Sequence, residues 1–306
     1  MVLGFRSVTI QLRSLFRISN GERTKHKDSK TMKGSPDVPS LALNERKAAL
    51  RNSVLFLAVC SPLIFAPRYF SVPHPVIPLA LLLIVTATFL RWDGRSAAVL
   101  GLNPSSRSVG HFAAGFGGGT LLIITAASIA RFVLPFPWQW NPQFDPTAAA
   151  TWLLYLFFSN FAEELTFRGY GFERLIAGIG HWPAQIATAM LFAVFHVLNG
   201  WPWQVAIVGT TVGSLLFGLV FVRWRSVPAA AGVHIAVNWT REMLFSDPPT
   251  LRTLFGPLSP RPWTFTEQLL SIAIILGLSL VACVMVAISM RTLKCNRPSS
   301  SATGSK

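Results

Sequence analysis

The chain has 306 residues, of which 51% are hydrophobic and only 13% are charged, and its mean hydropathy is +0.47. Soluble domains carry about 25% charged residues, so this composition argues against a soluble protein and favours a membrane protein. The net charge of +15 does not indicate nucleic acid, because the cations gather in the first fifty residues and at the ends of apolar runs, where they contact lipid headgroups and set topology.

Residues 1–46 form a basic, polar segment that we expect to be a disordered cytosolic tail. The apolar runs that follow are 18–25 residues long, about the length a helix needs to cross a hydrocarbon core of about 30 Å. They predict an all-α polytopic transmembrane bundle over residues 47–291, followed by a polar cytosolic tail at 292–306. About eight spans are expected, at residues 47–66, 76–92, 110–134, 147–176, 183–198, 203–224, 227–245 and 265–290.

The charges of the connecting segments predict the topology of this bundle. The connections at 135–146 and 199–203 contain no Lys or Arg, whereas the two tails and the connections on the same side as the tails are basic. Uncharged and basic connections therefore alternate along the chain. This alternation places both termini in the cytoplasm and the protein in the inner, cytoplasmic membrane. Three cations, Arg241, Arg252 and Arg261, fit less well, because they would then lie on the outer side.

The segment SNFAEELTFRGYGFERL at residues 159–175 places two adjacent carboxylates in an otherwise apolar helix. An ionised carboxylate there costs at least about 2.5 kcal/mol, so such residues usually have a partner and a function. Arg168 lies four residues after Glu164, in the favourable orientation for an ion pair. We therefore expect Glu164 to pair with Arg168 and to support the helix. Glu163, rotated by about 100°, keeps a free carboxylate that a purely architectural pair would not explain.

Two further motifs place imidazoles and an amide on other spans. FAVFH ends at His196, and a lone histidine on an apolar helix is more often a satisfied core residue than a catalyst. HIAVN places His234 and Asn238 four residues apart, on one helix face. That pair could join helices by hydrogen bonds or donate to an oxyanion, and the pattern alone does not decide between the two.

Together these residues supply what is needed to activate a water against an amide carbonyl. A carboxylate and a histidine can hold and deprotonate a water, and donors from other helices can stabilise the oxyanion. Intramembrane carboxylates and imidazoles also form proton relays in transporters. A transporter often shows an internal repeat, and none is evident in this sequence.

The motifs EELTFR, FAVFH and HIAVN, in this order on separate spans, resemble those of the CPBP family of CAAX prenyl endopeptidases and Abi-type bacteriocin-processing proteins. The resemblance covers a catalytic core at about 148–245 and implies an intramembrane endopeptidase. It implies that Glu163 is the general base and that His196 positions the water. The oxyanion pocket would be His234 with Asn238, supported by the pair of Glu164 and Arg168.

Many members of this family are described as metalloendopeptidases, so zinc is one cofactor that the resemblance raises. Its ligands would be Glu163, His196 and His234, but the sequence lacks an HExxH motif and we favour a metal-free glutamate mechanism. The expected partners are membrane lipids and a membrane-associated peptide or protein, with no nucleic acid. A non-catalytic immunity or scaffold protein of the same fold is the alternative. Glu173 and Arg174 are expected to form a solvated helix end. Glu242 could reach the outer rim of the site, but a surface charge close to a loop is the better interpretation.

Overall fold

The computed structural model describes residues 42–69, 75–135, 137–245, 250–257 and 263–295. These residues all belong to one compact unit. Most of the expected N-terminal tail at 1–46 and of the C-terminal tail at 292–306 lies outside the described residues. The last residues of the expected N-terminal tail begin the first described helix at Leu43, and the last described helix continues to Cys295.

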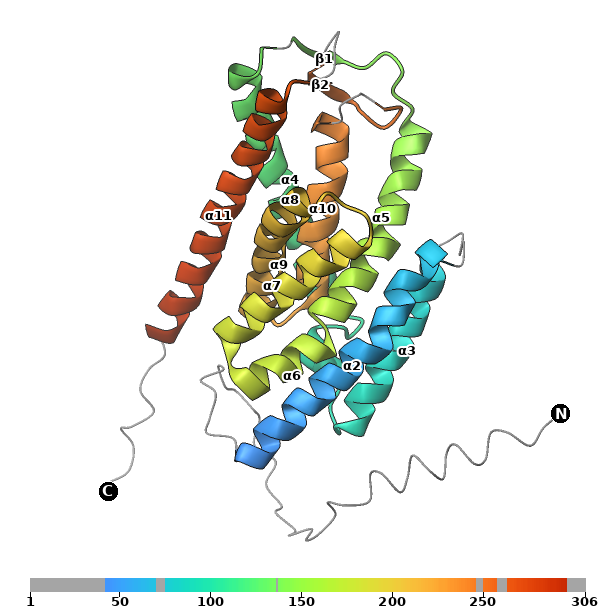
Figure 1. Cartoon of the computed structure of the whole chain (residues 1–306), viewed down its shortest axis with the longest axis vertical. Helices are drawn as coiled ribbons and strands as arrows, with labels where there is room; N and C mark the ends of the chain where they lie inside the picture. The colour runs from blue at the N-terminus through green and yellow to red at the C-terminus, as the bar shows by residue number, and fades with distance from the viewer. Residues whose placement is uncertain (1–41, 70–74, 136, 246–249, 258–262, 296–306) are drawn as a thin grey trace, which may run out of the picture. The chain divides into compact units, whose positions relative to one another are not determined.

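Helices dominate the described residues, and the two short strands form one small sheet (Figure 1). The helices are α2 (Leu43–Tyr69), α3 (Val76–Trp92), η1 (Ala97–Leu100), α4 (Ser106–Val133), α5 (Pro146–Phe167), α6 (Tyr170–Ile179), α7 (His181–Leu198), α8 (Trp203–Val205), η2 (Ala206–Thr210), α9 (Thr211–Trp224), α10 (Val227–Phe245) and α11 (Phe265–Cys295). The strands are β1 (Trp138–Trp140) and β2 (Phe255–Pro257). The expected all-α bundle is confirmed.

Within the described part of the chain, five stretches are long and apolar enough to cross a membrane: 43–65, 106–133, 181–198, 203–224 and 265–291. The protein is therefore a multi-pass membrane protein. The helices α5 and α10, which carry the charged and polar motifs, are not among the five. Most of α10 is buried by its neighbours, so this helix has no need of the all-round apolar surface that lipid imposes.

Helices α4 and α10 pack with their backbones in close contact. A Cβ atom at Gly115 would lie 2.2 Å from the carbonyl oxygen of Ala229, and one at Gly232 would lie 2.3 Å from that of Phe112. Small residues allow membrane helices to approach in this way. The contact fixes α10 two residues before His234.

The expected span at 147–176 is wrong, because the chain breaks there into α5 and α6. Arg168 ends α5, and its backbone N–H donates to the carbonyl of Glu164 at 2.7 Å. At the next residue, Gly169, a Cβ atom would lie 2.0 Å from the carbonyl oxygen of Leu165. Only glycine fits this close approach without a shift of the backbone. The break therefore places both motif carboxylates near the C-terminal end of α5.

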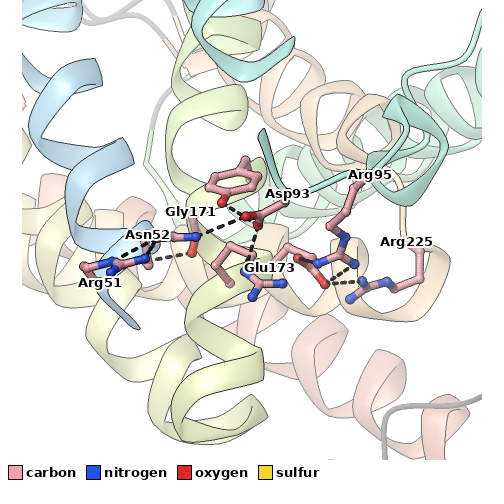
Figure 2. A network of polar contacts seen from close by, with 10 residues as sticks. Arg51, Asn52, Asp93, Arg95, Gly171, Glu173 and Arg225 are labelled. Carbon is pink, nitrogen blue, oxygen red and sulfur yellow. Dashed lines mark hydrogen bonds and ion pairs between the residues drawn. The ribbon is translucent and has the colours of Figure 1, made fainter. Parts of the chain in front are cut away.

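A partly buried polar network fixes α6 after this break (Figure 2). Asp93, which follows α3, accepts hydrogen bonds from Asn52 at 3.1 Å and from the hydroxyl of Tyr170 at 2.6 Å, and forms an ion pair with Arg174 at 3.3 Å. Burial, together with the hydrogen bond to Asp93, raises the pKa of Tyr170. The network thus joins α2, α3 and α6.

Glu173 forms the second centre of this network (Figure 2). It accepts from Arg95 at 2.8 Å and from Arg225 at 3.3 Å, and its side chain is 9% exposed. The expectation that Glu173 and Arg174 are solvated charges is therefore wrong. Cations from the segment after α3 and from the turn between α9 and α10 neutralise this carboxylate, which therefore joins α6 to both of these segments.

The sheet lies against the C-terminal end of α10. Trp138, Gln139 and Trp140 of β1 pair antiparallel with Pro257, Gly256 and Phe255 of β2, respectively. The backbone N–H of Leu254 donates to the carbonyl of Met243 in α10 at 3.0 Å. Figure 1 shows β1 and β2 above this end of α10, where α5 begins.

Candidate active site

Glu164 is the centre of the site's hydrogen-bond network. Its Oε1 atom lies 3.1 Å from Nη1 of Arg168 and 2.8 Å from Nδ1 of His234. Glu164 and Arg168 are fully buried, and His234 is 4% exposed. The expected ion pair between Glu164 and Arg168 is therefore present, and it extends to a third residue on another helix.

Arg168 connects this network to α9. Its Nη2 group donates to the carbonyl oxygen of Ser214 at 2.9 Å and also to the hydroxyl of Ser214. Its guanidinium lies 4.7 Å from the ring centroid of Phe192 and 5.4 Å from that of Phe217. These contacts hold the cation rigidly behind the site. Sequence reasoning missed Ser214, because nothing in the apolar pattern of 211–224 marks its role.

The hydrogen bond to Glu164 fixes the orientation of His234. A carboxylate only accepts, so Nδ1 of His234 carries a hydrogen. The other nitrogen, Nε2, then points toward Oε2 of Glu163, 4.0 Å away. The imidazole also stacks on Phe217, with 4.4 Å between ring centroids and 21° between planes. A histidine oriented by a carboxylate behind it presents one defined nitrogen to the reaction.

His196 is oriented in the same manner by a different acceptor. Its Nδ1 lies 2.8 Å from the backbone carbonyl oxygen of Phe192, one turn earlier in α7. Since a carbonyl only accepts, Nδ1 is the donor and Nε2 is left with a lone pair. The ring lies edge-on to Trp201, 5.0 Å between centroids. His196 can therefore accept a hydrogen bond from a water.

Glu163 differs from Glu164 in its surroundings. Its side chain is 16% exposed. Its Oε2 atom is buried and has no hydrogen-bond partner among the described residues, as is also true of Oε2 of Glu164, but Glu163 lines the cavity and Glu164 does not. The Nε2 atom of His234 lies 4.0 Å from this Oε2 atom. A carboxylate oxygen with an unused lone pair inside a cavity is what a general base requires.

One cavity of about 750 Å³ brings the predicted residues together. Glu163, His196, His234 and Asn238 all line it. Glu164 and Arg168 do not line the cavity and lie behind it, as expected for supporting residues. His196, near the C-terminal end of α7, shares the cavity with the residues of the other two motifs.

Asn160 also lines the cavity, and sequence reasoning missed it. It is 3% exposed, and its Nδ2 group has no hydrogen-bond partner among the described residues. It lies one turn before Glu163 and Glu164 in α5. Glu164 contacts His234, and Trp239 contacts Ala149, so α5 and α10 run antiparallel. Asn160 lies one turn before Glu164, and Asn238 lies one turn after His234. Both amides are therefore displaced in the same direction from the contact between Glu164 and His234.

The spacing of Asn160 from Glu163 in the sequence could have identified it as a site residue. An amide three residues before Glu163, in a helix that is otherwise apolar, shares a face with that carboxylate. Glu242, expected at the surface, also lines the cavity and pairs with Arg252 at 2.9 Å. That expectation is therefore wrong.

The three side chains that the resemblance suggests as zinc ligands do not fit a metal ion as they are placed. In the described part of the chain, no group of three or more His, Cys, Asp or Glu side chains is arranged to hold one. We derive no catalytic step through a metal.

Comparison with known proteins agrees with the family that the motifs resemble. Residues 145–240 match a family model described as type II CAAX prenyl endopeptidase Rce1-like. This segment is about a third of the chain and contains all three motifs. The resemblance to CAAX-type endopeptidases is therefore confirmed over the segment that forms most of the cavity. No curated protein matches the chain.

Proposed function

We propose that this chain, with its Rce1-like segment, is an intramembrane endopeptidase in which Glu163 activates the attacking water. Its substrate is a peptide bond of a membrane-associated protein or peptide. The observation that carries the proposal is the buried Oε2 atom of Glu163. It has no hydrogen-bond partner among the described residues, and Glu163 lines the same cavity as His196 and His234.

In the first step Glu163 takes a proton from the water while the water oxygen adds to the carbonyl carbon. The lone pair of His196 Nε2 accepts the water's other hydrogen and fixes its direction. In the second step the C–N bond breaks, and Glu163 returns the proton to the departing nitrogen. Water is thus consumed once, and one carboxyl and one amino group are formed. No side-chain nucleophile is required.

The negative charge that develops on the carbonyl oxygen needs donors. Asn238 offers its amide N–H groups from the wall of the cavity. His234 can donate from Nε2 when both ring nitrogens carry hydrogens. Its Nε2 lies 4.0 Å from Oε2 of Glu163, and His234 lines the same cavity as Asn238. Glu164 and Arg168 act through His234 and are positioning residues.

The location of the protein follows from its sequence. The alternation of basic and uncharged connections supports a cytoplasmic membrane, with both termini in the cytoplasm. Under that topology His234 lies near the cytoplasmic end of α10, about 10 Å from Val227. Cleavage then takes place near the cytosolic side of the membrane, on a substrate held by lipid.

The proposal is tested with the purified protein in lipid vesicles and a library of membrane-tethered peptides. Wild type and Glu163→Gln are compared on the whole library. Cleavage by the wild type that disappears in the variant supports the proposal. Equal cleavage by both contradicts the assigned role of Glu163. If neither cleaves any member of the library, while a proton-flux assay detects transport, the transporter alternative is favoured.

A further inference from the structure

Asn160 is a buried polar side chain that the proposed mechanism leaves without a role. It lies in α5, it is 3% exposed, and it lines the cavity. Its Nδ2 group has no hydrogen-bond partner among the described residues. Burying an amide without a partner destabilises a protein, and an apolar side chain of similar size would avoid that cost. The stability of the fold therefore does not explain an asparagine at this position.

The other two asparagines that line the cavity each have a role. Asn199 donates from Nδ2 to the carbonyl oxygen of Phe195 at 2.9 Å, at the C-terminal end of α7. Asn238 donates to the oxyanion in the proposed mechanism. Among the described residues that line the cavity, Asn160 is thus the amide used neither by the fold nor by that mechanism. An unsatisfied buried group of this kind needs an explanation, and a ligand in the cavity supplies one.

The position of Asn160 indicates which part of a ligand it can reach. It precedes Glu163 by three residues, which is about 4.5 Å along α5, and the two positions lie about 60° apart around the helix axis. An extended peptide advances by about 3.3 Å per residue. When Glu163 activates a water at the scissile carbonyl, Asn160 therefore lies about one peptide group away from that carbonyl.

The peptide group next to the scissile one needs a partner on a different helix from the oxyanion donor. Successive peptide groups of an extended chain point in opposite directions. Asn238 takes the scissile carbonyl oxygen from α10 in the proposed mechanism, so the adjacent group faces away from that donor. Asn160 belongs to α5. Its amide offers both an N–H donor and a carbonyl acceptor, which are the two complements of a peptide group.

We propose that Asn160 is a substrate-binding residue that hydrogen-bonds the peptide group next to the scissile one. This inference rests on the proposed function, and it assigns Asn160 to binding of the substrate main chain rather than to the chemical step. Main-chain hydrogen bonds supply affinity whatever the side chains of the bound peptide are. The contact therefore holds peptides of different sequence in an extended conformation beside Glu163.

The test removes one main-chain N–H of a bound peptide at a time. The Glu163→Gln chain in detergent is titrated with the membrane-tethered peptides of the library, and the peptide with the lowest Kd is chosen. Each peptide bond of that peptide is then replaced in turn by an ester, which has no N–H donor and a weaker carbonyl acceptor. At the position that Asn160 contacts, the ester should raise Kd about three- to tenfold, as expected for the loss of one hydrogen bond.

Adding Asn160→Leu should bring the ester-to-amide ratio of the Kd values at that position close to one. Asn199→Leu is the matched control, because the amide of Asn199 lines the cavity but is bonded to Phe195, and it should leave the ratio unchanged. Mass spectrometry of the products of the wild-type chain identifies the cleaved bond, which should be the neighbour of the sensitive one. Thermal melting verifies folding, and Asn160→Ala takes the place of Asn160→Leu if the latter is unfolded.

Ester effects that are equal with and without the Asn160 side chain overturn the inference, because a purely structural residue affects all analogues alike. A sensitive bond two or more positions from the cleaved one overturns it as well, and so does the absence of any bound peptide. If Asn160→Leu in the cleaving chain lowers kcat and leaves KM and the ester effects unchanged, Asn160 belongs to the oxyanion pocket and the inference is wrong. The two proposals fail separately: an ester effect that depends on Asn160, without cleavage by the wild type, contradicts only the peptidase, and cleavage without that effect contradicts only the assignment of Asn160.

Discussion

Replacing Glu164 by Gln should destabilise the protein far more than the same change at Glu163. Glu164 is fully buried and its Oε1 contacts both Arg168 and His234. Without the carboxylate charge, Arg168 keeps only Ser214 and two aromatic faces as partners. Removing one member of a buried ion pair costs about 3–5 kcal/mol. Since the Gln oxygen can still accept one hydrogen bond, we expect a loss of about 3 kcal/mol.

Thermal denaturation in detergent measures this loss. For a domain of this size, about 3 kcal/mol corresponds to a fall in Tm of roughly 6–12 °C. Glu163→Gln is the matched control, because the side chain of Glu163 is 16% exposed and lies 4.0 Å from its ion-pair partner His234, and it should lower Tm by less than about 3 °C. Similar melting temperatures for the two variants would refute the division of roles between the two carboxylates.

A double variant distinguishes the cost of losing the ion pair between Glu164 and Arg168 from the cost of leaving one buried charge without its partner. Arg168→Met alone leaves the carboxylate of Glu164 buried without its cation and should be at least as destabilising as Glu164→Gln. Combining Arg168→Met with Glu164→Gln removes both charges and should cost less than the sum of the single changes. Strict additivity would show that the two side chains do not act as a pair.

Three further predictions concern packing, positioning and cofactor. Gly232→Ala should lower Tm strongly, because its Cβ atom would lie 2.3 Å from a carbonyl oxygen of α4, while Gly117→Ala, with nothing within 4 Å, should not. Asn160→Leu should leave Tm unchanged or raised, because the amide has no hydrogen-bond partner among the described residues, but should lower kcat/KM about tenfold; an unchanged kcat/KM would exclude it from the site. Chelation verified by elemental analysis should leave cleavage unchanged, and activity restored by added zinc would contradict a metal-free mechanism.

The arrangement of the bundle could be predicted where a local pattern determines it. Apolar length alone predicted the positions of α3, α7 and α10 to within a few residues, and the predicted span at 203–224 covers α8, η2 and α9 together. The i,i+4 spacing of Glu164 and Arg168 on one helix was sufficient to predict their ion pair. Both predictions need only the repeat of a helix, and neither depends on which helices are neighbours.

The remaining features depend on contacts between distant segments. The bond between Glu164 and His234 requires α5 to pack on α10, and nothing in either motif specifies that neighbour. The break between α5 and α6 depends on the close approach at Gly169. Glu173 is buried because Arg95 and Arg225 reach it from other parts of the chain. A periodic pattern carries no information about such partners, so the sequence predicted that Glu173 is solvated.

The most direct test of the central claim is the single-turnover rate of cleavage in lipid, measured on the best substrate of the peptide library. General-base catalysis contributes roughly 10²–10⁴-fold. Glu163→Gln should therefore cleave at least about a hundredfold more slowly than wild type, with unchanged substrate binding and unchanged Tm. A variant that binds and folds normally and cleaves within about threefold of the wild-type rate would contradict the claim that Glu163 activates the water.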